Sequence, residues 1–380
     1  IDSEYTNYTA NNNKAYLSYS VIGCENVAYS DTIDGSKNSM DCLSVRKVDL
    51  CYWNVDGEGN YNSQFLIQSQ NCIDSKFLFD CVNCQNCFLS SNLRNQSYVF
   101  KNKKLSKEEY EEAILEYKLN TFSGLEKARI ELKEMIEDVA IHRYAQIYSA
   151  QNSFGENISN SKNVYVGFDV QNGEDLNYVN RILNIKDSYD LTGAANAEFC
   201  YECMVPSFGG YKNISCYITL GSKECEYSFL LKNCTNCFGC VGLTNSQYCV
   251  LNKQYSKESY FEFVDKIKED MTTNPYIDSK DRQYGYGEFF PYEFCPFGYN
   301  ETVAHDYFTI SESFATEKGY NWYTREKPDY KISILAEDLE DKIEAVTDSI
   351  LNETIGCPND GNADFQCTTA YRITADELLF

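Results

Sequence analysis

Residues 12–102 show neither the 3.6-residue period of an amphipathic helix nor a sustained alternation of polar and apolar positions. A short motif recurs instead: a polar Asn, Asp or Lys, then a small or branched residue, then a Cys, Ser or Tyr that leads into an apolar run. A fixed short period of this kind is typical of a stacked β-solenoid. The most regular positions are 9, 12, 12 and 12 residues apart: Cys42, Cys51, Ser63, Ser75 and Cys87.

The same motif continues through residues 155–252, and the chain contains an internal duplication. Residues 79–110 and 229–260, aligned at a constant offset of 150 without a gap, are identical at 15 of 32 positions. We therefore predict two β-solenoid lobes, parallel β-helix-like, with about 12 residues per coil. At about 3.3 Å per residue such a coil has a circuit of about 40 Å, which suits two short strands and two turns. An antiparallel meander with one strand per repeat is the alternative.

Each lobe is predicted to end in a helix that covers its last strands. Ser106 and Glu109 have the spacing of a capping box, and Ser123 is expected to restart a helix after a break. Ser256 begins the matching helix of the copy, which should end before Pro275. A short helix is also expected over residues 336–343.

The predicted fold class is mainly β with helical caps: a duplicated β-solenoid followed by a small irregular α+β C-terminal region. The last region is rich in Tyr, Phe, Gly and Pro. The predicted boundaries of the parts of the chain are as follows. Residues 1–105 and 151–255 form the first and second lobes, and residues 106–150 and 256–275 form the helical caps. Residues 276–380 form the aromatic-rich region with the start of a zinc-ribbon-like tail.

The net charge of −24 disfavours nucleic acid and anionic membranes, because both are bound mainly through Lys and Arg. No apolar run approaches the roughly 18–20 residues that span a bilayer. Because the chain begins at Ile1 rather than Met, we interpret it as a fragment, so a missing signal peptide proves nothing about secretion. The expected location is the cytoplasm. The composition does not predict an oligomeric state.

Residues from about 230 to 380 resemble an uncharacterised Cys/Asn-rich repeat family of very small uncultivated bacteria, and the earlier repeats resemble it loosely. The resemblance rests on segments that begin at Asn233-Cys-Thr-Asn-Cys-Phe, Asn252-Lys-Gln-Tyr, Gly287-Glu-Phe-Phe-Pro, Pro296-Phe-Gly-Tyr and Tyr371-Arg-Ile-Thr. It implies that members continue into a Pro-rich segment and a second cysteine pair, like a split zinc ribbon. Some members carry a CaiB/BaiF-type label, but nothing in this sequence resembles that α/β enzyme.

Cysteines at three-residue spacing, in 81–87 and 234–240, resemble most of an iron–sulfur ligand run. In the internal alignment, however, Cys81 matches Leu231 and Cys240 matches Ser90. A ligand that is replaced by Leu is no ligand, so these positions are interpreted as buried thiols that pack like small hydrophobes. A zinc half-site and disulfides stay open as alternatives.

Cys357 and Cys367 are the predicted metal ligands, because Cys357-Pro-Asn-Asp-Gly places a thiol in a turn. Zinc is the expected structural cofactor, with an incomplete site in this fragment. Neither His142 nor His305 is placed to help, and His305 beside Asp306 is interpreted as a structural residue.

The expected function is a non-catalytic binding or scaffold role, with stacked faces contacting a protein or glycan partner. The alternative is a carbohydrate-active β-helix lyase or hydrolase with paired carboxylates on one face. A zinc-dependent nucleic-acid adaptor is disfavoured by the acidity. No catalytic or cofactor-binding residue is predicted, but the repeat carboxylates considered for pairing are Asp41, Asp49, Asp74, Asp80, Asp187 and Asp190.

Overall fold

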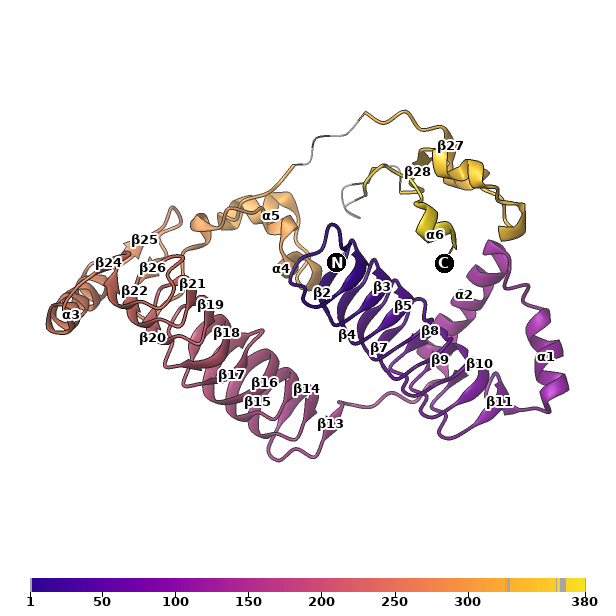
Figure 1. Cartoon of the computed structure of the whole chain (residues 1–380), viewed down its shortest axis with the longest axis horizontal. Coiled ribbons are helices and arrows are strands. Elements are labelled where there is room, and N and C mark those ends of the chain that lie inside the picture. The colour runs from indigo at the N-terminus through magenta and orange to yellow at the C-terminus, as the bar shows by residue number, and fades with distance from the viewer. Residues whose placement is uncertain (1, 325, 327–328, 360, 363–366, 380) are drawn as a thin grey trace. The chain divides into compact units, whose positions relative to one another are not determined.

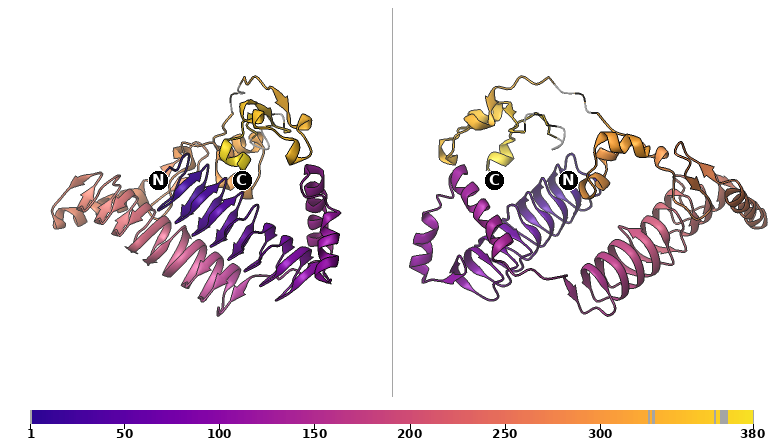
Figure 2. Two further views of the ribbon diagram at one scale, coloured as in Figure 1. Left: turned by 45° about the vertical axis from the view of Figure 1, so that its right-hand side comes forward. Right: turned by 180° about the vertical axis from the view of Figure 1, so that it is seen from behind.

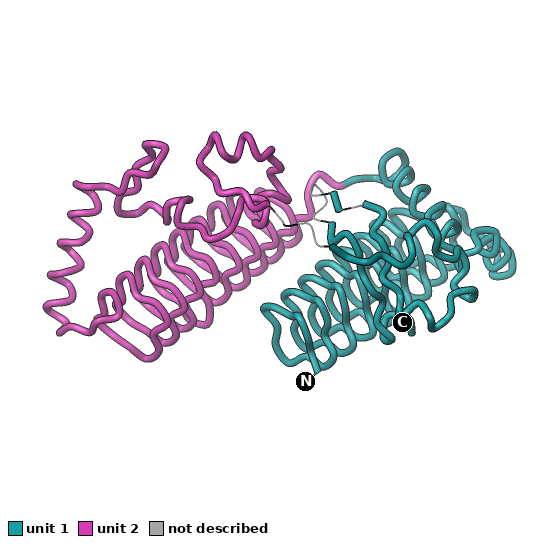
Figure 3. Tube along the Cα trace, turned by 90° about the horizontal axis from the view of Figure 1, so that it is seen from above, with its two compact units in different colours: residues 1–142, 326–380 teal, residues 143–325 magenta. Residues whose placement is uncertain are grey.

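The computed structural model describes residues 2–324, 326, 329–359, 361–362 and 367–379, and the chain forms two compact units (Figure 1, Figure 3). The first unit contains residues 1–142 and 326–380, and the second contains residues 143–325. Strands make up 40% of the structure and helices 21%, so the predicted mainly β class is confirmed. Among the described residues, no helix combines the length and the apolar character that crossing a bilayer requires.

In each unit the short strands stack one above another (Figure 1, Figure 2). The strands of the first unit are β1 (Asn13–Tyr16), β2 (Tyr19–Ile22), β3 (Glu25–Ala28), β4 (Asp31–Asp34), β5 (Lys37–Met40), β6 (Leu43–Arg46), β7 (Val55–Glu58), β8 (Gln64–Ile67), β9 (Lys76–Phe79), β10 (Gln85–Ser91), β11 (Ser97–Phe100) and β12 (Lys103–Lys104). Those of the second are β13 (Ile147–Tyr148), β14 (Phe154–Ser159), β15 (Lys162–Gln171), β16 (Glu174–Thr192), β17 (Ala195–Glu198), β18 (Tyr201–Tyr211), β19 (Tyr217–Leu220), β20 (Lys223–Glu226), β21 (Phe229–Lys232), β22 (Thr235–Phe238), β23 (Gln247–Val250) and β24 (Lys253–Gln254).

The chain pairs with itself in parallel at an offset of twelve residues, as in Asn13↔Glu25 of the first unit and Lys162↔Glu174 of the second. Within the described parts of the two stacks, the antiparallel pairs are the closing hairpins β11–β12 and β23–β24. The parallel register excludes the antiparallel meander. None of the described sheets closes on itself.

The backbone turns more often than the two turns per repeat that we expected. From Lys14 to Leu89 every third residue has a positive φ, and each lies directly before a buried residue. From Ala15 to Ser90, accordingly, every third residue is buried. Four such turns in twelve residues leave a narrow interior, which explains why its residues are small or of moderate size.

The second unit has the same three-residue period from Ile158 to Cys240, with one interruption. Buried positions recur every third residue up to Pro206 and again from Gly210. One residue is inserted between them, and the pairing of β17 with β18 shifts register there. The insertion is a β-bulge, which adds a residue without ending the stack.

Hydrogen bonds between buried side chains and the backbone link successive repeats through the interior. The Oγ of Ser75 donates to the carbonyl of Ile73 at 2.8 Å and accepts from the amide of Cys87 at 3.1 Å. Cysteine does the same at Cys24, whose Sγ accepts from the amide of Ser36 at 3.3 Å. The interior therefore needs Ser, Cys and Asn as well as aliphatic residues, because buried amides must be paired.

Two helices contact the last strands of the stacks, as predicted. Helix α1 (Lys107–Leu115) packs on β11 and α3 (Lys257–Thr273) packs on β23. The equivalent tyrosines Tyr110 and Tyr260 lie 5.8 Å from Tyr98 and Tyr248 between ring centroids. Helix α2 (Phe122–Asp138) begins after its N-cap Thr121, two residues before the expected restart at Ser123.

The remaining segments are irregular, as predicted. Short 3₁₀ turns at Ala336–Asp338 and Ile343–Ala345 replace the continuous helix expected over residues 336–343. The other strands and α-helices are β25 (Tyr276–Ile277), β26 (Gln283–Tyr284), α4 (Val303–Tyr307) and α5 (Glu312–Lys318) in the second unit, and β27 (Ile334–Leu335), β28 (Ile355–Gly356), β29 (Ala370–Tyr371) and α6 (Ala375–Leu379) in the first.

Candidate functional site

One side of the first unit carries large side chains at intervals of twelve residues. Residues twelve apart lie one above another at the strand spacing of about 4.8 Å, so their rings can meet. Phe65 and Phe77 stack with centroids 4.5 Å apart, and Trp53 lies 5.7 Å from Phe65. We call this column the aromatic face; it consists of Tyr5, Leu17, Tyr29, Asp41, Trp53, Phe65, Phe77 and Leu89, all at positive φ.

Helix α2 covers one end of the aromatic face and leaves the other end open. Ala128 and Leu132 of α2 pack in one apolar cluster with Phe65 and Phe77. Phe77 is 0% exposed under the helix, whereas Tyr5 at the other end is 75% exposed. The same column of residues therefore serves as core at one end and as surface at the other.

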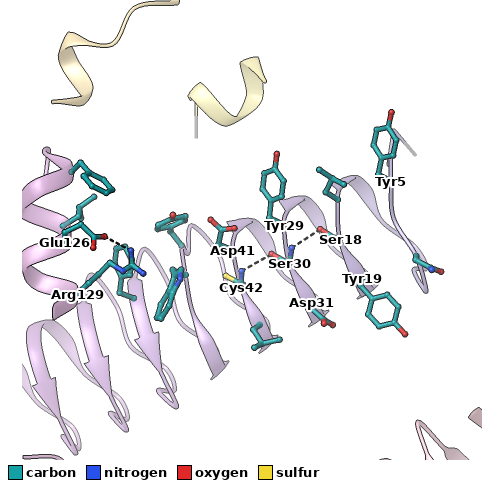
Figure 4. A pocket seen from close by; sticks show the side chains of 18 residues that line it. Tyr5, Ser18, Tyr19, Tyr29, Ser30, Asp31, Asp41, Cys42, Glu126 and Arg129 are labelled. Carbon is teal, nitrogen blue, oxygen red and sulfur yellow. Dashed lines mark hydrogen bonds and ion pairs between the residues drawn. The ribbon is translucent and has the colours of Figure 1, made fainter. Parts of the chain in front are cut away.

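A broad pocket of about 900 Å³ lies along the open end, beside the start of α2. Figure 4 shows Tyr5, Tyr29 and Asp41 on one side of the strands and Tyr19 and Asp31 on the other. The α2 side chains that line it are Phe122, Leu125, Glu126 and Arg129.

The charged groups of the pocket are partly neutralised. Arg129 pairs with Glu126 at 2.6 Å and lies 5.8 Å from the ring of Trp53. Burial raises the pKa of Asp41, and a hydrogen bond from Tyr52 partly offsets that effect. Burial also raises the pKa of Tyr52 to about 12, so its hydroxyl stays protonated and can donate.

Most of the carboxylates considered for catalysis have structural partners. The Nδ2 of Asn38 donates to Asp49 at 2.9 Å, and that of Asn62 donates to Asp74 at 2.7 Å. Asp80 accepts two bonds from the Arg94 guanidinium, at 2.7 and 2.9 Å. Asp187 is exposed at a positive-φ position.

A second carboxylate lies beside Asp190. The pairs Tyr189↔Tyr201 and Leu191↔Cys203 place Asp190 next to Glu202 on adjacent strands. Burial raises the pKa of both groups, and the charges of Asp190 and Glu288 raise that of Glu202 further. We did not predict Glu202 as a candidate, although its position twelve residues after Asp190 was a usable signal.

The cysteines of the repeats lie inside the stacks. Cys81, Cys84 and Cys87 are three successive interior residues of one repeat, and the Sγ of Cys84 faces the Val82 carbonyl at 3.4 Å. All of the repeat cysteines are buried, free thiols. Burial raises the pKa of Cys42 to about 12, so this thiol is protonated at neutral pH and is a poor metal ligand. In the residues described, no group of three or more His, Cys, Asp or Glu could hold a metal ion.

The two predicted metal ligands lie close together at a hairpin of the first unit. Strands β28 and β29 pair antiparallel, and the Cys367 thiol lies close enough to Cys357 to act on its pKa. The amides of Gly361 and Thr369 donate to the Sγ of Cys367, each at 3.3 Å. The Asn359 amide lowers the pKa of Cys357, but the neighbouring Cys367 thiol raises it, and the net shift is upward. Two thiols supply half of a tetrahedral zinc site.

His305 packs among aromatic rings of the second unit. Its ring lies 5.9 Å from Tyr299 and 5.5 Å from Trp322, edge-on to both. The Nδ1 atom is buried without a hydrogen-bond partner among the described residues. The ring contacts fit a structural role, but we expected a structural histidine with satisfied hydrogen bonds, and the unpaired Nδ1 differs from that expectation.

Comparisons with known proteins do not assign the chain to a family. No family model matches it, and no curated protein matches it. Among solved structures, a chain described as an acetyltransferase from Desulfovibrio desulfuricans G20 has 9% identity, over 73% of this chain and 86% of that one. With a TM-score of 0.13, this similarity carries no information about fold or function.

Proposed function

We propose that this is a non-catalytic binding or scaffold protein built on two β-solenoids, of which the first holds an aromatic face for contact with a partner. The observation that carries the proposal is the change along the aromatic face, from full burial of Phe77 under α2 to 75% exposure of Tyr5. A large apolar surface that continues from a packed interface is typical of a contact site.

Two kinds of partner suit such a surface, and one is better supported. Tyr and Trp rings can stack on sugar rings, which favours a glycan. The covered end of the same face, however, already accepts a helix, because Ala128 and Leu132 of α2 pack on Phe65 and Phe77. We therefore favour an amphipathic segment of a protein.

A selection experiment on the whole chain tests this function. Phage-displayed peptides and an oligosaccharide array are screened against the protein and against Tyr29→Ala. We expect peptide ligands whose binding falls at least about tenfold in Tyr29→Ala and is kept in Tyr165→Ala, a matched exposed tyrosine of the second unit. If neither screen yields a ligand that depends on Tyr29, the proposal is wrong.

The second candidate function is that of a carbohydrate-active enzyme, and the adjacent carboxylates favour it. Asp190 and Glu202 occupy neighbouring strands, about 4.8 Å apart in the backbone, which suits a retaining pair. Release of shortened products from the arrayed oligosaccharides, lost in Glu202→Gln, would support this candidate over the first.

We also propose that Cys357 and Cys367 provide two ligands of a structural zinc ion, and that the protein works in the cytoplasm. The buried cysteines support the location, because free thiols persist in reducing compartments. The zinc proposal rests on the proximity of the two thiols and on the amides that donate to Cys367.

A further inference from the structure

The aromatic face contains one carboxylate, that of Asp41, between Tyr29 and Trp53. Backbone bonds stack these three positions in successive repeats: the Asp41 amide donates to the carbonyl of Ala28 at 3.2 Å, and the Trp53 amide donates to that of Met40 at 3.1 Å. Successive repeats are about 4.8 Å apart, so an aromatic residue lies on either side of the carboxylate along the stack. Such an arrangement attracts a cation, because the carboxylate supplies opposite charge and the ring faces add cation–π attraction.

Asp31 supplies a second carboxylate to the same pocket. It directly follows Ser30, whereas Asp41 directly precedes Cys42, and the Cys42 amide donates to the Ser30 hydroxyl at 3.1 Å. The two carboxylates therefore flank one row of buried residues in adjacent repeats. Figure 4 shows them on opposite sides of that row.

The pocket has more negative than positive groups. Three carboxylates line it, and of its described lining residues Arg129 alone is a Lys or Arg. Arg129 pairs with Glu126 at 2.6 Å, which leaves Asp31 and Asp41 without a counter-charge from the lining. The hydrogen bond that Asp31 accepts at 2.7 Å comes from the neutral hydroxyl of Thr32. A cation beside Asp41 would offset the burial that raises the pKa of this carboxyl.

The covered end of the aromatic face shows which kind of segment the face accepts. Helix α2 places the Arg129 guanidinium 5.8 Å from the ring of Trp53. Ala128 and Leu132 of the same helix join the apolar cluster around Phe77. One helix thus brings a basic side chain to a ring of the face and apolar side chains to its buried part.

We infer that the open end of the aromatic face binds a basic amphipathic segment of a partner protein, whose Lys or Arg side chains reach Asp31 and Asp41 while its apolar side chains cover the rings. This inference rests on the proposed function and adds the chemical class of the ligand. The net charge of −24 favours the same partner at longer range, because opposite charges steer and speed the encounter.

Two synthetic amphipathic peptides of about fourteen residues test the charge of the ligand, one made of leucine and lysine and the other of leucine and glutamine. Binding to the whole chain is followed by fluorescence in a Trp322→Phe background, which leaves Trp53 as the only tryptophan. We expect the lysine peptide to bind at least about tenfold more tightly than the glutamine peptide. Equal binding of the two peptides, or no binding of the lysine peptide, would overturn the inference.

A pair of variants locates the contact. Asp31→Asn/Asp41→Asn should weaken binding of the lysine peptide at least about tenfold and leave that of the glutamine peptide unchanged, which separates loss of charge from loss of fold. Asn keeps an oxygen acceptor and tolerates the positive φ of 54° at Asp41. The control Asp187→Asn/Glu224→Gln removes two exposed carboxylates of the second unit and should bind the lysine peptide as the parent protein does. Equal weakening in both variants would show unspecific attraction to an acidic protein and overturn the inference.

Failure of the inference can be told apart from failure of the proposed function. Peptides from the phage selection that depend on Tyr29 should carry Lys or Arg and lose affinity in Asp31→Asn/Asp41→Asn. Selected peptides that depend on Tyr29 but contain neither Lys nor Arg would leave the proposed function standing and the inference wrong.

Discussion

Single buried residues hold successive repeats together through side-chain hydrogen bonds. Ser18, Ser30 and Cys42 form one such row, in which the amides of Ser30 and Cys42 donate to the preceding hydroxyl at 3.2 and 3.1 Å (Figure 4). A hydroxyl or thiol in this position both accepts from the next repeat and donates to a carbonyl of its own. The buried backbone groups therefore require the small polar side chain as a hydrogen-bond partner.

Ser75 offers a direct test of this role. Ser75→Ala would leave the buried amide of Cys87 without its acceptor, which should cost about 1–3 kcal/mol in the free energy of unfolding. Ser75→Cys should cost much less, because Cys24 accepts an equivalent bond. The measurement is urea unfolding of the first unit, followed by Trp53 fluorescence in a Trp322→Phe background.

The control is Ser153→Ala, a partly exposed serine near the start of the second stack. It should leave unfolding of the first unit unchanged. The interpretation fails if Ser75→Ala is as stable as the parent protein, or if Ser75→Cys is as unstable as Ser75→Ala.

This dual role also explains why the sequence does not reveal the three-residue period. The buried positions include Ser36, Asn60 and Gly57 as well as Val45 and Leu66, so they do not stand out as hydrophobic. The positive-φ positions include Tyr, Leu, Phe and Val, which disfavour that conformation by about 1–2 kcal/mol each. Pairing across repeats overrides these local preferences. The twelve-residue spacing was readable because it is the repeat of the stack, whereas the turn at every third residue was not.

At the level of elements, the two copies begin their terminal helices with different caps. Ser106 and Glu109 form a complete capping box, with bonds of 3.2 and 2.8 Å. In the copy, Ser256 accepts from the amide of Ser259 at 3.2 Å, but Ser259 replaces the glutamate. The α1 and α3 start sites were predictable from sequence because this chemistry is local.

Exchanging the residues at the third position of α1 and α3 tests how much the capping box stabilises a helix. Glu109→Ser should destabilise α1 by about 0.5–1 kcal/mol, since it removes both a hydrogen bond and a favourable charge at the helix start. Ser259→Glu should stabilise α3 by a similar amount. Amide hydrogen exchange of the two helices measures both effects, with Glu112→Ser as a control. Opposite signs, or equal effects of Glu109→Ser and Glu112→Ser, would contradict the capping account.

The candidate site was only partly predictable at this level. Trp53, Phe65 and Phe77 have the twelve-residue spacing of the repeat, so their column could have been read from the sequence. Its division into a covered and an open end could not, because that depends on where α2 packs, and α2 lies far from these residues in the sequence. Contacts between distant segments leave no periodic signal.

At the level of the whole molecule, the two copies of the stack are covered by different segments of the chain. After α3, the second unit places Tyr286 against Tyr227 and hydrogen-bonds it to Glu226, whereas the first unit places α2 on its aromatic face. The duplication therefore predicts the two scaffolds but not their surfaces, and binding properties cannot be transferred from one copy to the other.

The zinc proposal also concerns the whole molecule, because two thiols need two further ligands. In the described residues no third His, Cys, Asp or Glu joins Cys357 and Cys367, so the two further ligands would come from outside the described residues or from a second copy of the chain.

We expect one zinc per chain in the purified protein if further ligands lie in the same chain, and one per two chains, with dimerisation, if a second copy supplies them. Elemental analysis with light scattering distinguishes the two cases. Cys357→Ser should lose the metal, whereas Cys295→Ser, at an exposed cysteine outside the pair, should keep it. Absence of zinc from the parent protein, or equal zinc in both variants, would rule out this site.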